Sequence, residues 1–244
     1  FGRIVVFVFP GRRRKMKFSE KLRKEVDPIW QESFQHPFVQ GIGEGTLPVE
    51  NFKYYVLQDA YYLSHFAKVQ ALGAAKANSF ETTNRMAAHA QSTYEAEHAL
   101  HESFTEILGI TEEEIKAFQP SPTAYAYTSH LYRAAYDGHL GDVIAAILPC
   151  YWLYYEVGEV LKNCTPDHPV YQKWISTYGG EWFKRSVEEQ INRLDEIALS
   201  VTDSDLERMK QHFVISSRYE LMFWEMAYQL ESWQSIGRKE GKYV

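Results

Sequence analysis

Apolar residues recur at the three- to four-residue spacing of amphipathic helices from Phe18 to Trp233, and this period constrains the fold more than any other feature. Helix signals divide the pattern: Pro48 stands where a first-turn proline belongs, and Thr111 with Glu114 forms a capping box. Strand-like alternation between turn signals is absent from this stretch. The sequence therefore predicts an all-α fold, a single-domain helical bundle of about eight helices.

The predicted helices are bounded by capping residues, prolines and glycines. They cover about 19–34, 48–77, 81–108, 121–136, 142–162, 181–199 and 203–233, with short helices starting near 111 and 169.

The first fifteen residues follow a different pattern. They hold five basic residues and no acidic one, and their apolar run IVVFVF is far too short to cross a membrane. The charge follows the apolar run, whereas a secretory signal places its charge first. We expect residues 1–15 to be a non-native N-terminal extension, and residues 16–244 to form one all-α domain.

The charge and the cysteine content of the sequence limit the kinds of partner and the cellular compartment that we expect. The net charge is −6, and the basic cluster before residue 16 leaves the rest more acidic still. Nucleic-acid surfaces need a basic stripe, so we expect no nucleic-acid partner and favour a small molecule. Two cysteines, Cys150 and Cys164, are too few for a disulfide framework, and no apolar run is long enough for a membrane span. We expect a cytoplasmic protein with no membrane contact.

Cys150 lies in the segment LPCYWLYYEVGE, where a proline interrupts a helical pattern. Pro149 has no N–H for the carbonyl of Ala145, so we expect a local opening that turns the cysteine toward a pocket. Tyr154 shares its face, and an aromatic wall for a flat ligand is predicted from Tyr151, Trp152 and Tyr155. A nucleophilic thiolate would need a base or a positive partner from another helix. An inert buried cysteine is the alternative.

Two carboxyl groups lie on aromatic helix faces. Asp59 shares its face with Tyr55, Tyr62 and Phe66, and Glu220 shares its face with Ser216, Ser217, Phe223 and Trp224. Burial would raise the pKa of such a carboxyl group, as a general acid requires. The alternatives are a solvated Asp59 at a helix edge and a plain salt bridge between Arg218 and Glu220.

A metal or haem site is a competing interpretation. Glu95 and His98 have the Glu-x-x-His spacing of di-iron bundles, but such bundles need this motif twice and no second copy occurs. We therefore expect residues 94–102, including His101, to be a polar helix surface, with no metal ligand and no cofactor. His65 or His130 would be the axial ligand if haem were bound.

Five ordered blocks resemble the thiaminase II (TenA) family. They are HPFVQGIGEGTLPVENFKYYVLQDAYYL (36–63), PSPTAYAYTSHLYR (120–133), LPCYWLYYEVGE (148–159), YQKWISTYGGEWF (171–183) and FVISSRYELMFWEMAY (213–228). The resemblance covers essentially all of residues 16–234.

The resemblance implies a haem-oxygenase-like fold without haem, and a homotetramer. It implies hydrolysis of 4-amino-5-aminomethyl-2-methylpyrimidine to hydroxymethylpyrimidine and ammonia in thiamin salvage, and also cleavage of thiamin to hydroxymethylpyrimidine and thiazole. The small-molecule partner would be that aminopyrimidine or thiamin. A metal-dependent or haem oxygenase on the same fold, and a non-catalytic regulatory binding protein, are the alternatives.

The resemblance also implies roles for individual residues. Cys150 would be the nucleophile, Glu220 the general acid/base, and Asp59 the group that holds the aminopyrimidine edge. The pocket would be lined by Tyr62, Tyr127, Tyr154, Tyr178 and Phe223.

Overall fold

The computed structural model describes residues 16–234, except for the side chains at positions 96 and 97. The predicted extension over residues 1–15 lies outside the described residues. Within them the chain forms eleven α-helices and no strand. The all-α prediction is confirmed, and the count of about eight helices is wrong.

The difference arises mainly at the start of the chain, where one helix was predicted over 19–34. The structure has three, α1 (Phe18–Glu25), α2 (Asp27–Gln35) and α3 (Pro37–Glu44). Pro28 lies in the first turn of α2, and Pro37 begins α3. Proline disfavours helical geometry in the residue before it, and His36 is accordingly extended. Its Nδ1 accepts a hydrogen bond from the backbone N–H of Phe38 at 3.1 Å.

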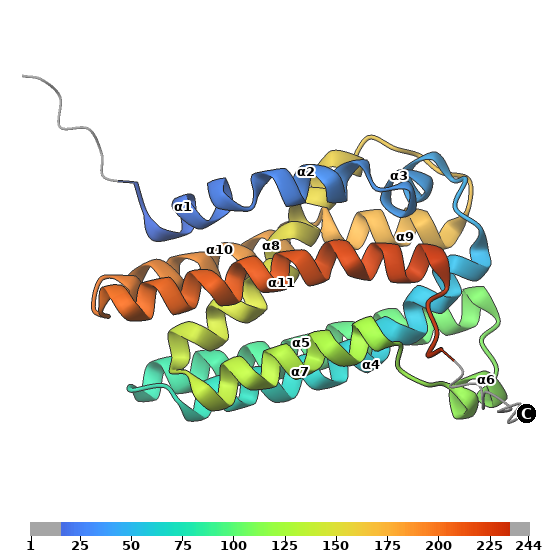
Figure 1. Ribbon diagram of the computed structural model, residues 1–244. Coiled ribbons are helices and arrows are strands. Elements are labelled where there is room, and N and C mark those ends of the chain that lie inside the picture. Colours follow the sequence, from blue (N-terminus) through green and yellow to red (C-terminus); the bar gives the residue numbers. More distant parts are fainter. Residues whose placement is uncertain (1–15, 235–244) are drawn as a thin grey trace, which may run out of the picture.

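The helices form two layers (Figure 1). One layer contains α4 (Val49–Ala75), α5 (Phe80–Leu108) and α7 (Pro122–Asp137), with the short α6 (Glu112–Ala117) beyond the end of α5. Helix α4 packs against both α5 and α7. The Ser79 hydroxyl accepts the N–H of Thr82 at the start of α5, and Gly109 ends that helix with a φ of 61°. These ends lie within two residues of their predicted positions.

The other layer contains α9 (Pro169–Tyr178), α10 (Glu181–Ala198) and α11 (Asp203–Gln229), together with α1 to α3 (Figure 1). Helix α8 (Leu140–Leu161) crosses between the layers and packs against helices of both. Helix α11 stops before the predicted end at Trp233, because Leu230 adopts a left-handed conformation with a φ of 52°.

Helix α8 is the apolar centre of the bundle. Every residue from Leu140 to Pro149 is buried. The helix continues through Pro149 without a break, so the expected opening does not appear as an interruption of α8. No helix within residues 16–234 combines the length and apolarity needed to span a membrane.

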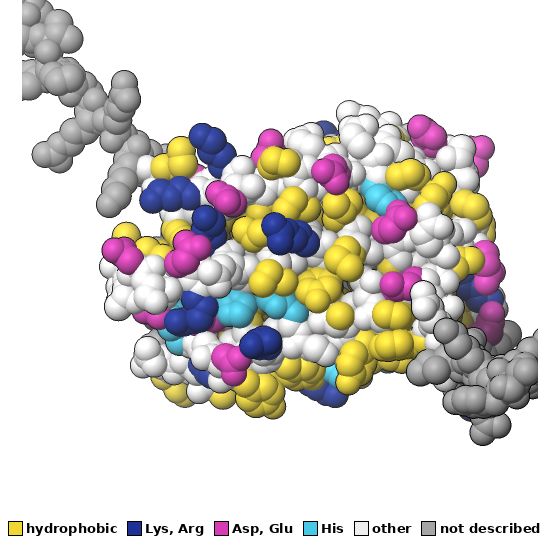
Figure 2. Space-filling model, in the orientation of Figure 1, with side chains coloured by type: hydrophobic (Ala, Val, Ile, Leu, Met, Phe, Trp, Pro, Cys, Tyr) yellow, Lys and Arg dark blue, Asp and Glu magenta, His cyan; other side chains and the backbone are white. Residues whose placement is uncertain are grey.

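The surface seen in Figure 2 mixes charged and hydrophobic side chains. Basic and acidic groups are scattered over this face, and the basic groups do not gather into a continuous stripe.

Candidate active site

A small cavity of about 50 Å³ is bordered by α4, α5, α8, α9 and the start of α10. Four of the predicted site residues line it: Asp59, Cys150, Tyr154 and Tyr178. None of the described lining residues is a lysine or an arginine. The cavity therefore combines a thiol and a carboxyl group with aromatic walls.

Glu220 lies on α11 and is only 2% exposed. The Tyr127 hydroxyl donates a hydrogen bond to its Oε1 at 2.6 Å. Burial raises the pKa of Glu220 to about 8; the hydrogen bond from Tyr127 lowers it, and the charge of Asp59 raises it. Arg218 is exposed, so the salt-bridge alternative is wrong. Glu220 is protonated at neutral pH and can donate a proton.

Asp59 lies on α4 and is 6% exposed, so a solvated position at a helix edge is wrong. Burial raises the pKa of Asp59, and the charge of His101 opposes this rise. The Nε2 of His101 lies 3.5 Å from Oδ2 of Asp59. The sequence did not indicate this partner, because residues 94–102 were expected to form a polar helix surface.

Tyr62 and Tyr127 lie close to Cys150, although neither lines the cavity itself. Burial, followed by the negative charge of a Cys150 thiolate, raises the pKa of Tyr62 well above its usual value. Burial, then the charges of Glu220 and Cys150, do the same to Tyr127. The two tyrosine rings lie 4.8 Å apart. The cysteine and Glu220 thus approach the same pair of tyrosines.

The remaining aromatic residues of the predicted set lie around these groups. The ring of Phe223 lies 5.8 Å from that of Tyr62, and Phe223 does not line the cavity. The ring of Tyr178 lies 4.9 Å from that of Tyr154. The Tyr154 hydroxyl accepts a hydrogen bond from Tyr55 at 3.2 Å, and burial raises the pKa of Tyr154 well above its usual value.

The aromatic wall predicted beside Cys150 is only partly present. Tyr151 lines the cavity, and its hydroxyl accepts a hydrogen bond from Gln70. Trp152 instead packs against Trp30, with ring centres 5.7 Å apart, and Tyr155 does not line the cavity. The wall is completed by residues for which no role in the site was expected, among them Thr93, Thr177, Trp182 and Phe183.

Gly158 allows α8 to approach the end of α9. A Cβ at this position would lie 2.6 Å from both the backbone N of Gly179 and the carbonyl C of Tyr178. Real Cβ atoms do not come so close, so only glycine permits this contact. The contact places Tyr178 against Tyr154, one turn before Gly158 on α8.

The histidines considered as metal or haem ligands have other positions and partners. His98 is exposed, and no cluster of three His, Cys, Asp or Glu side chains that could hold a metal ion occurs in the described part of the chain. His65 Nδ1 lies 2.9 Å from the Tyr132 hydroxyl, and His130 Nε2 lies 3.1 Å from the Ser216 hydroxyl. Both rings considered for haem are thus engaged in hydrogen bonds within the protein.

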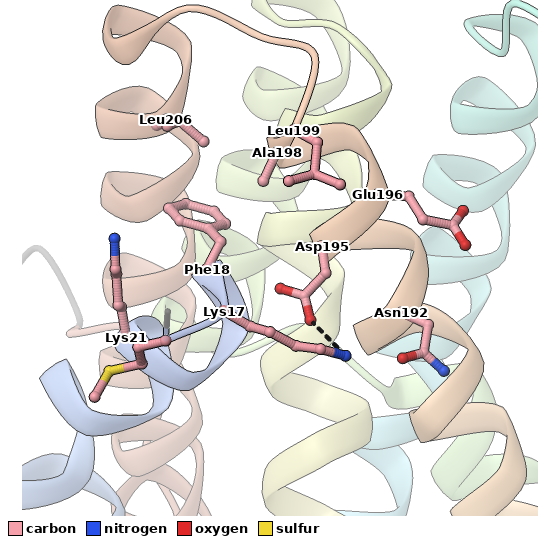
Figure 3. A pocket seen from close by; sticks show the side chains of 10 residues that line it. Lys17, Phe18, Lys21, Asn192, Asp195, Glu196, Ala198, Leu199 and Leu206 are labelled. Atoms are coloured by element: carbon pink, nitrogen blue, oxygen red, sulfur yellow. Dashed lines mark ion pairs between the residues drawn. The ribbon is translucent and has the colours of Figure 1, made fainter. Parts of the chain in front are cut away.

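A larger pocket of about 510 Å³ lies where α1 begins and α10 ends (Figure 3). Phe18, Leu199 and Leu206 contribute apolar side chains to it, and Lys17 forms an ion pair with Asp195 at 3.7 Å. None of the predicted site residues lies there. The cysteine and the buried carboxyl group of Asp59 line the smaller cavity instead.

Comparison with known proteins identifies the family of this chain. The family model described as TENA/THI-4/PQQC family matches residues 23–230. An aminopyrimidine aminohydrolase from Bacillus subtilis (strain 168) is 62% identical over 225 residues, covering 92% of this chain and 95% of that protein.

Solved structures show the same fold. A TenA homologue from P. horikoshii OT3 is 30% identical, with a TM-score of 0.79 over 88% of this chain and 99% of that one. A domain of unknown function from Shewanella denitrificans OS217, described as having a heme oxygenase-like fold, gives a TM-score of 0.69 at 17% identity, over 86% of this chain and 91% of that one. The chain belongs to the TENA/THI-4/PQQC family.

Proposed function

We propose that this protein is an aminopyrimidine aminohydrolase. It hydrolyses 4-amino-5-aminomethyl-2-methylpyrimidine to hydroxymethylpyrimidine and ammonia in thiamin salvage, and it also cleaves thiamin to hydroxymethylpyrimidine and thiazole. The close relative from Bacillus subtilis carries the name of the first activity.

One observation carries the proposal. A cysteine thiol and a buried carboxyl group face the same small cavity, and a second buried carboxyl group, Glu220, accepts a hydrogen bond from Tyr127, which interacts with Cys150. Because burial raises the pKa of Glu220 to about 8, one carboxyl group can act as an acid near neutral pH. A nucleophile with an acid beside it is the arrangement that covalent hydrolysis of a C–N bond needs.

Binding would orient the flat ring before the chemistry begins. Tyr154 and Tyr178 border the cavity and offer ring faces on which a pyrimidine can stack. Asp59 would accept a hydrogen bond from the amino group of the ring, and Glu220 would protonate a ring nitrogen. The positively charged aminomethyl group would lie beside Cys150 and favour its thiolate.

The thiolate of Cys150 then adds to a ring carbon, and the displaced electron pair is taken up by the protonated ring nitrogen. This electron pair returns to expel the amino group from the methylene carbon; that group already carries its proton, so it leaves as ammonia while Glu220 remains a carboxylate. Water adds to the methylene carbon and gives its proton to the Glu220 carboxylate. Loss of the thiolate and of the proton on the ring nitrogen restores the aromatic ring. The covalent route divides one difficult displacement into easier steps.

The decisive experiment measures ammonia release from the aminopyrimidine by the parent chain and by Cys150→Ala. Cys164→Ser is the matched control, because Cys164 is also a half-buried free thiol but does not line the cavity. We expect release by the parent and the control and at least a thousandfold loss in Cys150→Ala.

Other outcomes would contradict the proposal. Full activity in Cys150→Ala would remove the cysteine from the mechanism. Tight binding of the aminopyrimidine by a folded parent chain without ammonia release would indicate a regulatory binding protein instead.

We further propose a homotetramer in the cytoplasm. The tetramer follows from the family resemblance, and the two free cysteines fit a reducing compartment. Light scattering at micromolar concentration tests the assembly, and a monomer would contradict it.

A further inference from the structure

His101 connects Asp59 with the surface of the bundle. It lies on α5, its side chain is 18% exposed, and its Nε2 lies 3.5 Å from Oδ2 of Asp59. It also borders a surface groove of about 750 Å³ formed by one face of α5. Asp59 itself lines the inner cavity. The imidazole ring therefore stands between solvent and the buried carboxyl group.

Two potential anions interact with Asp59 in addition to this ring. Burial disfavours the carboxylate, and Glu220 from α11 and Tyr154 from α8 interact with Asp59 as potential anions. His101 from α5 opposes these effects through its charge, with Nε2 at 3.5 Å from Oδ2 of Asp59. The carboxylate form of Asp59 thus depends on its histidine neighbour.

Charged groups near His101 come from α5, α9 and α4. On α5 itself, Glu102 pairs with the exposed His98 at 3.6 Å, and Glu106 borders the same groove. From α9, Lys173 donates a hydrogen bond to the Ser103 hydroxyl at 2.5 Å. From α4, the acidic partner is Asp59. Acidic groups from α4 and α5 thus lie around the ring.

The two buried carboxyl groups have different partners, and this difference suits them to different roles in the reaction. Glu220 has a tyrosine as its partner and remains protonated at neutral pH, so it is suited to donating a proton. Asp59 has an imidazole as its partner, so it is suited to accepting a hydrogen bond as a carboxylate. A neutral Asp59 would present a hydroxyl group in place of an acceptor oxygen.

From this geometry we propose that His101 is a positioning residue for the hydrolysis: it holds Asp59 as a carboxylate and fixes its orientation toward the amino group of the substrate. The inference rests on the proposed function for the identity of the substrate. The pairing of His101 with Asp59 can be tested without any substrate.

The test compares His101→Leu with His101→Gln. Leucine fills the space without a donor, whereas glutamine keeps a neutral N–H donor near the position of Nε2. We expect His101→Leu to raise KM for the aminopyrimidine about tenfold to a hundredfold, with a smaller change in kcat. The acidic limb of the kcat/KM profile moves to higher pH, because Asp59 then requires a higher pH to ionise. His101→Gln recovers most of the loss in KM.

His98→Leu is the matched control, because His98 lies on the same helix and borders the same groove but does not pair with Asp59. It should leave KM and the pH profile unchanged. A purely structural role for His101 would lower the melting temperature without moving the acidic limb, and that result would overturn the inference.

A titration without substrate separates this inference from the proposed function. Carbon-detected NMR of aspartate-labelled protein, assigned with Asp59→Asn, follows the Asp59 carboxyl group directly. We expect its titration to move to higher pH in His101→Leu. An unchanged titration would refute the role of His101, whereas absence of turnover by the parent chain would refute the proposed substrate alone.

Discussion

The hydroxyl of Tyr127 lies 2.6 Å from Oε1 of Glu220, and both side chains are buried. The hydrogen bond favours the charged carboxylate, while burial favours the neutral acid. Burial has the larger effect, and the pKa of Glu220 is about 8. The hydrogen bond from Tyr127 therefore limits the rise in the pKa of Glu220. This balance between burial and hydrogen bonding has measurable consequences.

Glu220 should make the folded state less stable as the pH rises. Its pKa is raised from an ordinary value of 4.5 to about 8, so between these values the folded state holds a proton that the unfolded state has lost. The stability of Glu220→Gln relative to the parent should therefore increase from pH 5 to pH 8. Urea denaturation at both pH values measures the difference. Glu207→Gln, an exposed change on the same helix, should show no such trend.

Tyr127→Phe should move the alkaline limb of the kcat/KM profile. It removes the hydrogen bond that lowers the pKa of Glu220, so the acid remains protonated to a higher pH. We expect an upward shift of about half to one pH unit, together with slower turnover. The control is Tyr132→Phe, since Tyr132 is on the same helix but has His65 as its partner. A limb that stays in place would show that Glu220 does not set it.

Hydroxymethylpyrimidine should protect Cys150 from alkylation. Cys150 lines the cavity and Cys164 does not, although both are half-buried cysteines outside any disulfide. Intact-mass measurement with iodoacetamide should show that the product slows modification of Cys150 about tenfold or more at saturating concentration. Equal protection of both thiols, or of neither, would place the ligand elsewhere.

Gly158→Ala should disturb the cavity through α9. The new Cβ would lie 2.6 Å from backbone atoms of Tyr178 and Gly179, so one helix must shift. We expect a loss of about 1–3 kcal/mol in unfolding free energy and a higher KM. Gly109→Ala is the control: its φ of 61° costs about 1 kcal/mol, but no atom lies within 4 Å of the new Cβ. It should leave KM unchanged.

Pro149→Ala should cut turnover while the protein remains folded. Helix α8 is continuous at Pro149, but alanine restores the N–H that the carbonyl of Ala145 lacks and removes the proline ring that crowds this carbonyl, so the turn before Cys150 tightens and the thiol shifts. Steady-state kinetics with a circular dichroism control tests this. Unaltered activity would show that the proline has no part in placing the thiol.

The sequence allowed the helical class and most helix ends to be predicted, because caps and glycines act locally. Ser79 and Gly109 bound α5 in the structure, close to where the pattern predicts. Pro28 and Pro37 indicate in the sequence where α2 and α3 begin, because each lies in the first turn of its helix.

The site was less predictable, because its contacts join distant helices. The positions of Asp59 and Glu220 on aromatic faces indicated buried carboxyl groups, and both are buried. The partner of Asp59 was not apparent, because His101 follows exposed residues on a polar stretch of α5. Trp152 is close to Cys150 in the sequence, but residues two positions apart on a helix face different sides, and Trp152 packs against Trp30 from α2.

The close contact at Gly158 also concerns how the protein folds. The cavity is bordered by helices from the early (α4, α5), middle (α8) and late (α9, α10) parts of the sequence. A backbone contact between α8 and α9 helps to close it. Such long-range contacts form only as the whole bundle condenses, so no fragment that lacks one of these helices holds a partial catalytic centre. Catalytic activity therefore requires the cooperatively folded bundle as a whole. A single cleavage between these helices should abolish both the activity and the cooperative unfolding transition.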